Sequence, residues 1–234
     1  MHDPFYDLFP RPPHAEWRLE EVALVTIDMQ YMDAHRDGWM GRVAQSHGRQ
    51  DLLAQRYDAI ERIIPRIREL QDAFREGGHE VLHVRIAYRT EDGRETGRAF
   101  MPSPHEQAVP RDPRDDEILP EVAPVGDELV FSKTSSSAFS TTDIERVLWN
   151  LGIRHLIMTG LVSDGCVELT ARDAADRGFS VTLVEDACCS STPEAHADAI
   201  HRMTDGGFIG ALSTAEALEH LSLLSAHTAE AVAT

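Results

Sequence analysis

The chain has 234 residues, 42% of them hydrophobic and 26% charged, and a formal net charge of −18 at pH 7. This composition is typical of a water-soluble globular protein, and the length fits one α/β domain or two small ones. An acidic surface repels phosphate backbones and anionic lipids, and no apolar stretch approaches the length of a membrane span. The sequence therefore argues against nucleic-acid and membrane partners.

The cysteines and the N-terminal residues indicate where the protein works. Three cysteines, of which Cys188 and Cys189 are adjacent, make no disulfide framework, and we assign no role to these two. Residues 1–14 have neither the basic start nor the apolar run of a secretion signal. The sequence thus predicts a cytoplasmic protein with reduced thiols.

Apolar, β-branched runs alternate along the chain with segments of helical periodicity. The predicted strands are residues 22–27, 79–86, 128–132, 155–158, 179–184 and 208–212. The predicted helices are residues 51–75, 142–150, 166–177, 193–203 and 214–225. Pro65 should break or kink the first of these helices. The alternation predicts an α/β fold, a three-layer, doubly wound, six-stranded parallel sheet with helices on both faces.

The other segments set the domain boundaries and two long connections. Residues 1–18, rich in proline and aromatic side chains, predict an N-terminal arm that lies on the body or on a neighbouring subunit of a homo-oligomer, a dimer or a tetramer. Residues 19–225 form a single domain without internal repeats, and residues 226–234 form a C-terminal tail. Residues 31–50 and 87–126 predict long loops, the first a candidate lid and the second a wall of the site.

Two charged residues follow predicted strands. Asp28 comes directly after the first strand, where open α/β sheets place their ligands, although most aspartates at strand ends only cap a turn. Lys133 follows the third strand and is the only lysine among 22 basic residues, the others being arginine. A desolvated lysine can exchange a proton, whereas arginine keeps its charge. A single lysine in such a chain is either an accident of composition or a functional group.

A turn between the fourth strand and the next helix carries Cys166. Residues 160–165 place its thiol at or near the helix N-terminus, where free N–H groups and the helix dipole favour a thiolate, although many cysteines only pack in a core. Asp28, Lys133 and Cys166 all follow the carboxyl ends of parallel strands, so we expect them to face one crevice. Together they would supply a nucleophile, a proton acceptor and a stabilising charge.

These motifs resemble those of the isochorismatase-like cysteine hydrolases. The similarity covers about residues 20–215. It rests on Asp28-Met29-Gln30, on Lys133 before Ser137-Ala138-Phe139, and on Thr159-Gly160 before Cys166-Val167-Glu168. That family includes nicotinamidases, isochorismatase, and amidohydrolases of N-carbamoylsarcosine, ureidoacrylate and biuret. The resemblance implies a triad of Asp28, Lys133 and Cys166, a six-stranded parallel sheet, and a cis peptide bond between Leu161 and Val162.

The resemblance also implies cleavage of a C–N bond in a small amide, ureide or carbamoyl substrate. Asp28 would take the thiol proton, Cys166 would attack the carbonyl carbon, and Lys133 would hold both anions in register. The backbone N–H groups of Val162 and Cys166 would form the oxyanion hole. Water would then hydrolyse the thioester, and no cofactor is required.

Other residues bear on the substrate and on metals. Arg85 and Tyr88, near the end of the second strand, and Phe139 are candidates to bind a polar substrate. Nicotinamidase-like members hold a metal with an aspartate and paired histidines, but His83 in the second strand has no second histidine at short spacing. We expect His83 to be a core residue and the site to hold no metal, which disfavours a nicotinamidase.

Two other functions remain open. One is hydrolysis of a vinyl ether, as in isochorismatase itself, but those members generally lack the cysteine nucleophile. The other is a non-catalytic scaffold or partner protein, which an intact triad disfavours. The residue pattern does not name the substrate, because the pocket depends on the shapes of the long loops.

Overall fold

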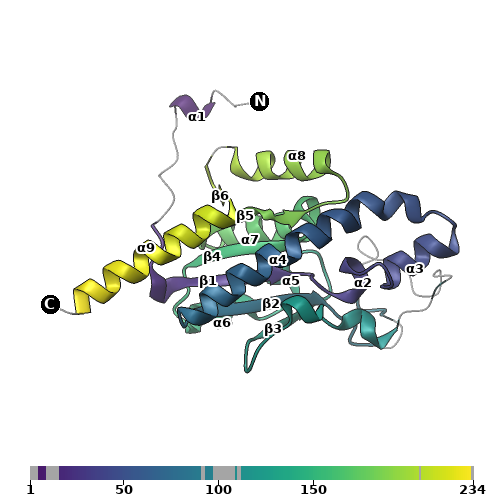
Figure 1. The fold of residues 1–234 in the computed structure, drawn as a ribbon, viewed down its shortest axis with the longest axis horizontal. Helices are drawn as coiled ribbons and strands as arrows, with labels where there is room; N and C mark the ends of the chain where they lie inside the picture. The colour runs from purple at the N-terminus through teal and green to yellow at the C-terminus, as the bar shows by residue number, and fades with distance from the viewer. Residues whose placement is uncertain are drawn as a thin grey trace.

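The computed structural model describes residues 5–8, 16–90, 93–96, 109, 112–205 and 207–232. Six strands form one sheet in the order β3-β2-β1-β4-β5-β6, and every neighbouring pair is parallel (Figure 1). The strands are β1 (Val22–Ile27), β2 (Glu80–Ile86), β3 (Val130–Lys133), β4 (His155–Leu161), β5 (Ser180–Cys189) and β6 (Gly210–Leu212). The predicted six-stranded parallel α/β sheet is confirmed.

Nine α-helices lie within the described residues. They are α1 (Phe5–Leu8), α2 (Tyr31–Ala34), α3 (Trp39–Ser46), α4 (Ala54–Glu76), α5 (Ala138–Thr141), α6 (Ile144–Asn150), α7 (Glu168–Asp176), α8 (Pro193–Thr204) and α9 (Thr214–Val232). Short 3-10 turns are η1 (Leu19–Glu21), η2 (Gln50–Leu53), η4 (Pro113–Asp116) and η5 (Pro120–Val122), and η6 (Ser163–Val167) is a π turn. No described helix is long and apolar enough to cross a membrane.

Two apolar clusters cover the two faces of the sheet. On one face α4 and α9 pack through residues such as Ile60, Phe74 and Leu221, and Figure 1 shows α4 crossing in front of the strands. On the other face, helices α5 to α8 pack through residues such as Leu148 and Ala171. Full burial of one large apolar side chain stabilises a fold by about 1.5–3 kcal/mol. These layers hold the strand ends, and the residues that follow them, in fixed positions.

The long helix does not break at Pro65, which was one of the two predicted outcomes, and a kink there stays a prediction. Residues 54–76 form one helix with Pro65 inside it. Proline removes one backbone hydrogen bond. Ile63 and Ile67 on either side of Pro65 are 3% and 0% exposed, and both belong to the cluster on that face of the sheet. Packing on both sides therefore keeps the helix continuous across the proline.

The helix α9 is longer than the predicted 214–225 and continues to Val232, into the segment expected to be a tail. Leu221 and Leu224 pack against the same apolar cluster as α4, so the helix has support beyond its first turns. Of the expected N-terminal arm, the structure describes only residues 5–8 and 16–18. Trp17 is buried there, with its ring 5.6 Å from that of His155.

Residues 31–50 do not form one open loop as predicted, because α2 and α3 lie within them. Trp39 packs with Met32 and Ile86 in a small separate cluster. The backbone N–H of Trp39 donates to Asp115 Oδ1 at 3.0 Å, and Arg42 binds the same carboxylate at 2.7 Å. A buried carboxylate in η4 thus holds this segment, which the sequence pattern did not reveal.

Strand β5 is also longer than the predicted 179–184. Beyond a register shift after Met158, β4 and β5 pair again, Gly160 with Cys188 and Leu161 with Cys189. Cys188 and Cys189 therefore lie inside β5, buried, and all three cysteines are free thiols.

Candidate active site

The candidate site lies where the strand order reverses. From β1 the chain adds β2 and β3 on one side and then returns to place β4 on the other side of β1. In open α/β sheets ligands bind beyond the carboxyl ends of the strands at such a switch point. Asp28 directly follows β1, Lys133 is the last residue of β3, and Cys166 lies in η6 after β4.

The structure brings these three predicted residues into contact. Lys133 Nζ lies 2.8 Å from Asp28 Oδ2 and 3.2 Å from Cys166 Sγ. Asp28 and Lys133 are 0% exposed, and Cys166 is 6% exposed. One ammonium thus bridges a carboxylate and a thiol, the three groups come from the ends of three different strands, and all three are shielded from bulk water.

The backbone around Asp28 is shaped for this contact. Asp28 has φ +54°, in the left-handed region that non-glycine residues seldom adopt, and its N–H donates to Val84 O at 2.8 Å. In the neighbouring strand Gly160 has φ +109°, and a Cβ there would lie 2.1 Å from Ile27 O. Glycine at position 160 therefore allows β4 to approach β1 closely just before both strands deliver their site residues.

Burial and charge set the protonation of the three groups. Burial raises the pKa of Asp28, although the Lys133 ammonium partly opposes this. Burial would lower the pKa of Lys133, but the charges of Asp28 and Cys166 outweigh it and raise that pKa. Burial and the Asp28 charge raise the pKa of Cys166 well above its ordinary value, against the effect of Lys133.

The expected lean of Cys166 towards the thiolate is therefore wrong for the resting site. The favoured state is a neutral thiol beside an Asp28–Lys133 ion pair, since a second anion would have to be desolvated next to the first. Asp28 Oδ1 is buried and has no hydrogen-bond partner of normal geometry among the described residues. It is the carboxylate oxygen that Lys133 does not contact, and its role as a proton acceptor stays a prediction.

The turn that carries the thiol is closely packed. The Leu161–Val162 peptide bond is cis, as the resemblance implied. Val162 O accepts hydrogen bonds from Gly165 N at 2.9 Å and from Val167 N at 3.2 Å. Val162 and Cys166, the predicted oxyanion-hole residues, thus bracket one tight turn. Their role towards a substrate stays a prediction.

The three predicted substrate-binding residues have partners within the protein. The half-buried Arg85 donates to Ser132 Oγ at 3.2 Å and to Asp116 O at 2.8 Å. Tyr88 packs against the small cluster of Met32, Trp39 and Ile86. Phe139 is 6% exposed, and its ring lies 5.7 Å from that of Phe179. These contacts hold the three side chains in place. Their contact with a substrate stays a prediction.

The structural role of Gln30 was not predicted from the sequence. Its Nε2 donates to Ile86 O at 2.8 Å and to Asp115 O at 3.0 Å, and its Oε1 accepts from Ile86 N at 2.6 Å. This fully buried amide ties the end of β1 to the end of β2 and to η4. Its place two residues after Asp28 was the available signal, but the contacts depend on residues more than fifty positions away.

No group of three histidine, cysteine, aspartate or glutamate side chains suited to hold a metal occurs among the described residues. His83 is fully buried, its Nε2 lies 2.9 Å from Glu128 Oε2, and burial lowers its pKa. It is a core histidine, as predicted. A reaction without metal or cofactor stays a prediction.

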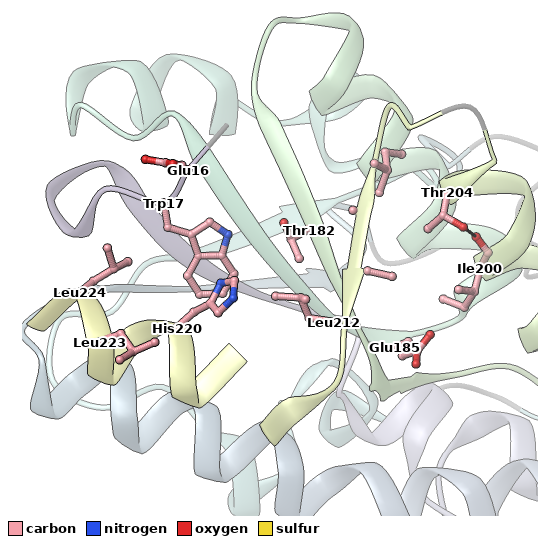
Figure 2. Close-up of a pocket in the computed structure, with 13 residues that line it drawn as sticks. Glu16, Trp17, Thr182, Glu185, Ile200, Thr204, Leu212, His220, Leu223 and Leu224 are labelled. Atoms are coloured by element: carbon pink, nitrogen blue, oxygen red, sulfur yellow. Dashed lines mark hydrogen bonds between the residues drawn. The ribbon is translucent and has the colours of Figure 1, made fainter. Parts of the chain in front are cut away.

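A separate cavity of about 740 Å³ lies at the β6 edge of the sheet (Figure 2). Trp17 and His220, with ring centroids 5.3 Å apart, form part of one wall, and Thr182 and Leu212 also line it. None of the predicted site residues, and no cysteine or lysine, lines this cavity. It therefore offers none of the chemistry found at the switch point.

Fold and site together define the class of the protein, a doubly wound α/β protein with a buried thiol, carboxylate and ammonium beyond the ends of its strands. Residues 22–217 match the model of the Isochorismatase domain, and the chain belongs to the isochorismatase family. It is similar to ureidoacrylate amidohydrolase RutB of Stutzerimonas stutzeri (strain A1501), with 26% identity over 200 residues, 79% of this chain and 76% of that protein.

The chain is also similar to a second curated protein and to a solved structure. N-carbamoylsarcosine amidase of Arthrobacter sp is 33% identical over 124 residues, which are 51% of this chain and 47% of that protein. The crystal structure of a cysteine hydrolase from Pseudomonas syringae pv. phaseolicola 1448A superposes with a TM-score of 0.74. That match has 23% identity and covers 92% of this chain and 99% of the other, so it supports the fold alone.

Proposed function

We propose that this hydrolase cleaves the C–N bond of a small amide, ureide or carbamoyl compound through a thioester on Cys166. The observation that carries the proposal is the Lys133 ammonium, 2.8 Å from Asp28 and 3.2 Å from Cys166 in a buried site. The names of two similar proteins, an ureidoacrylate amidohydrolase and an N-carbamoylsarcosine amidase, support C–N bonds as the target.

The first half-reaction follows from the resting protonation. The thiol is neutral and the carboxylate beside it has a raised pKa, so Asp28 takes the thiol proton as Cys166 Sγ attacks the carbonyl carbon. Lys133 stabilises the negative charge as it moves between carboxylate and sulfur. The N–H groups of Val162 and Cys166 stabilise the oxyanion, and one such donor is typically worth about 3–4 kcal/mol.

The second half-reaction uses the same carboxylate. Protonated Asp28 gives its proton to the departing nitrogen, the C–N bond breaks, and an acyl thioester remains on Cys166. Asp28 then takes a proton from water as the water attacks the thioester carbonyl. The C–S bond breaks, the acid leaves, and the sulfur regains its proton. A raised pKa suits this role, because a proton shuttle works best when its pKa approaches the working pH.

The alternative within the family is hydrolysis of a vinyl ether. That reaction needs no sulfur nucleophile, whereas here the thiol lies in contact with both charged residues. A panel of linear amides, ureides and carbamoyl amino acids, assayed for ammonia release, tests the proposal. We expect turnover of at least one member and, on rapid acid quenching, an acyl adduct on Cys166 in the intact-protein mass. Turnover of a vinyl ether alone, without any adduct, would contradict the proposal.

A further inference from the structure

The turn that carries Cys166 is fastened to α8 by a hydrogen bond outside the triad. Ser163 Oγ lies 2.7 Å from His196 Nδ1. Ser163 is 0% exposed, while His196 is half-buried in the first turn of α8. The next residue, Asp164, accepts a hydrogen bond from Ser190 Oγ at the end of β5. Two side-chain bonds thus anchor the first half of the turn from outside.

Helix α8 presents the imidazole from a fixed position. Thr192 caps the helix, with Oγ1 accepting from Ala195 N at 3.2 Å, and Pro193 is its first residue. Ala199 and Met203 on the same helix are buried in the core cluster that also contains Cys166. The imidazole therefore sits on a capped helix that packs in the same core as the turn.

His196 is suited to this contact in its neutral form. Burial lowers its pKa, and the charges of Glu185 and Asp164 only partly oppose this effect. A neutral imidazole has one ring nitrogen that accepts a hydrogen bond, so Nδ1 can accept from the buried Ser163 hydroxyl. The charged groups that line the small cavity beside His196 are Arg62 and Arg66 of α4 and Glu185 and Asp186 of β5.

Ser163 occupies a decisive place in the turn. It directly follows Val162, whose N–H is a proposed oxyanion donor and whose carbonyl receives the N–H groups of Gly165 and Val167. A rotation of the peptide unit between Val162 and Ser163 would move that carbonyl and loosen the turn. The triad contacts fix the sulfur, but they do not fix this peptide unit.

We propose that His196 is a positioning residue for the reaction, which through Ser163 holds the Val162–Cys166 turn in the geometry that stabilises the oxyanion. The inference rests on the proposed function, since it assigns His196 an effect on the same transition state. Misplacement of a reacting group by about 1 Å can cost roughly 100-fold in rate. His196 does not touch the reacting atoms. Its loss should therefore lower kcat without changing the reactivity of the Cys166 thiol.

The test compares His196→Ala with Ser163→Ala and with the exposed His201→Ala on the same helix. We expect His196→Ala and Ser163→Ala each to lower kcat by about 10- to 100-fold with KM changed less than about threefold, and His201→Ala to keep wild-type kinetics. The double variant should lose no more than either single variant, because both changes remove one bond. His196→Asn, whose side-chain amide can reach the position of Nδ1, should recover most of the rate.

Labelling of Cys166 separates positioning from damage to the triad. In His196→Ala the alkylation rate against pH should match the wild type, because Asp28 and Lys133 still contact the sulfur. Wild-type kcat in a folded His196→Ala, or losses that multiply in the double variant, would overturn the inference. If His196→Ala does not fold, Ser163→Ala decides alone. Failure of the proposed function looks different, since Cys166→Ala would then keep its turnover whatever happens at position 196.

Discussion

The fully buried candidate site and a partly buried cluster around Glu128 each join a cation to a carboxylate, and they differ in how completely that carboxylate is bonded. In the candidate site, Asp28 accepts from Lys133 through one oxygen, and its other oxygen has no partner of normal geometry among the described residues. In the second cluster, Glu128 accepts from Arg75 at 2.7 and 3.0 Å and from Val125 N at 3.0 Å, and it lies 2.9 Å from His83.

The pKa values follow this difference. Burial raises the pKa of Asp28, and the charge of Lys133, which opposes this effect most strongly, does not offset it. Burial would also raise the pKa of Glu128, but the bonds from Arg75, His83 and Val125 lower it to about 2. A fully bonded carboxylate is locked in its charged form and joins β2 to the segment before β3. A partly bonded, desolvated one can exchange a proton, as catalysis requires.

The largest expected effect separates activity from stability at the site. Cys166→Ala should abolish turnover, by at least about 10⁴-fold, because a covalent mechanism has no substitute for its nucleophile. The melting temperature should stay within a few degrees of wild type, since the sulfur is small. Steady-state kinetics and thermal melts measure both. Residual activity above a few per cent would rule out covalent catalysis at this position.

A reciprocal exchange of cations sharpens the comparison. Lys133→Arg should lower kcat/KM by about 100-fold or more, since the planar guanidinium is bulkier than an ammonium held between carboxylate and sulfur. Arg75→Lys loses the forked contact with Glu128 and should lower stability by about 1 kcal/mol while leaving activity within about twofold. Equal kinetics for Lys133→Arg and wild type would mean that the position needs only a charge.

The second cluster should reveal itself in stability against pH. The folded pKa of Glu128 is about 2 against an ordinary 4.5, so its contribution is full above the ordinary value and is lost as the pH falls towards 2. Glu128→Gln should therefore reduce the free energy of unfolding by about 1–3 kcal/mol at pH 7. Chemical denaturation of wild type and Glu128→Gln from pH 7 to acid pH should show this difference in the free energy of unfolding becoming smaller. The kcat of the variant should equal that of wild type. A difference that does not depend on pH would mean that packing, not charge, holds this cluster.

A smaller expected effect is the pH dependence of Cys166 alkylation. Because the pKa of Cys166 is raised, its alkylation by iodoacetamide should be slow at neutral pH and should increase only above the ordinary range of a thiol. Lys133→Ala removes the one charge that opposes this shift and should move the profile to still higher pH. His83→Gln, in the other cluster, should leave it in place. Peptide mapping distinguishes Cys166 from Cys189, whose pKa burial raises to about 12.

The smallest effect concerns metals. We expect EDTA to leave kcat and KM unchanged, because the proposed steps use only the thiol, the carboxylate, the ammonium and the turn. Loss of activity in EDTA that zinc or another divalent ion restores would contradict this prediction. Arg75→Lys serves as a control, since any general loosening of the fold would make that variant more sensitive than wild type.

Much of this protein follows from its sequence alone. Continuous apolar, β-branched runs form strands buried on both faces, so the six strands and their parallel direction could be predicted, but their order in the sheet was not. Asp28, Lys133 and Cys166 could be placed together because carboxyl ends of parallel strands meet at one edge of the sheet. These inferences depend on local patterns, which can be identified in a single sequence, and on a general rule of sheet topology.

Only the tertiary structure determines the protonation and the hydrogen-bond partners of these residues. The pKa of Cys166 is raised because burial and the charge of Asp28 outweigh the opposing charge of Lys133, and all three residues are far apart in the chain. Helix α3 forms against Asp115, and the turn that carries Cys166 is bonded through Ser163 to His196, by contacts that no periodicity encodes. Periodicity reports which face of an element is apolar. Protonation and hydrogen-bond partners depend on distances between segments, and those exist only once the chain has packed.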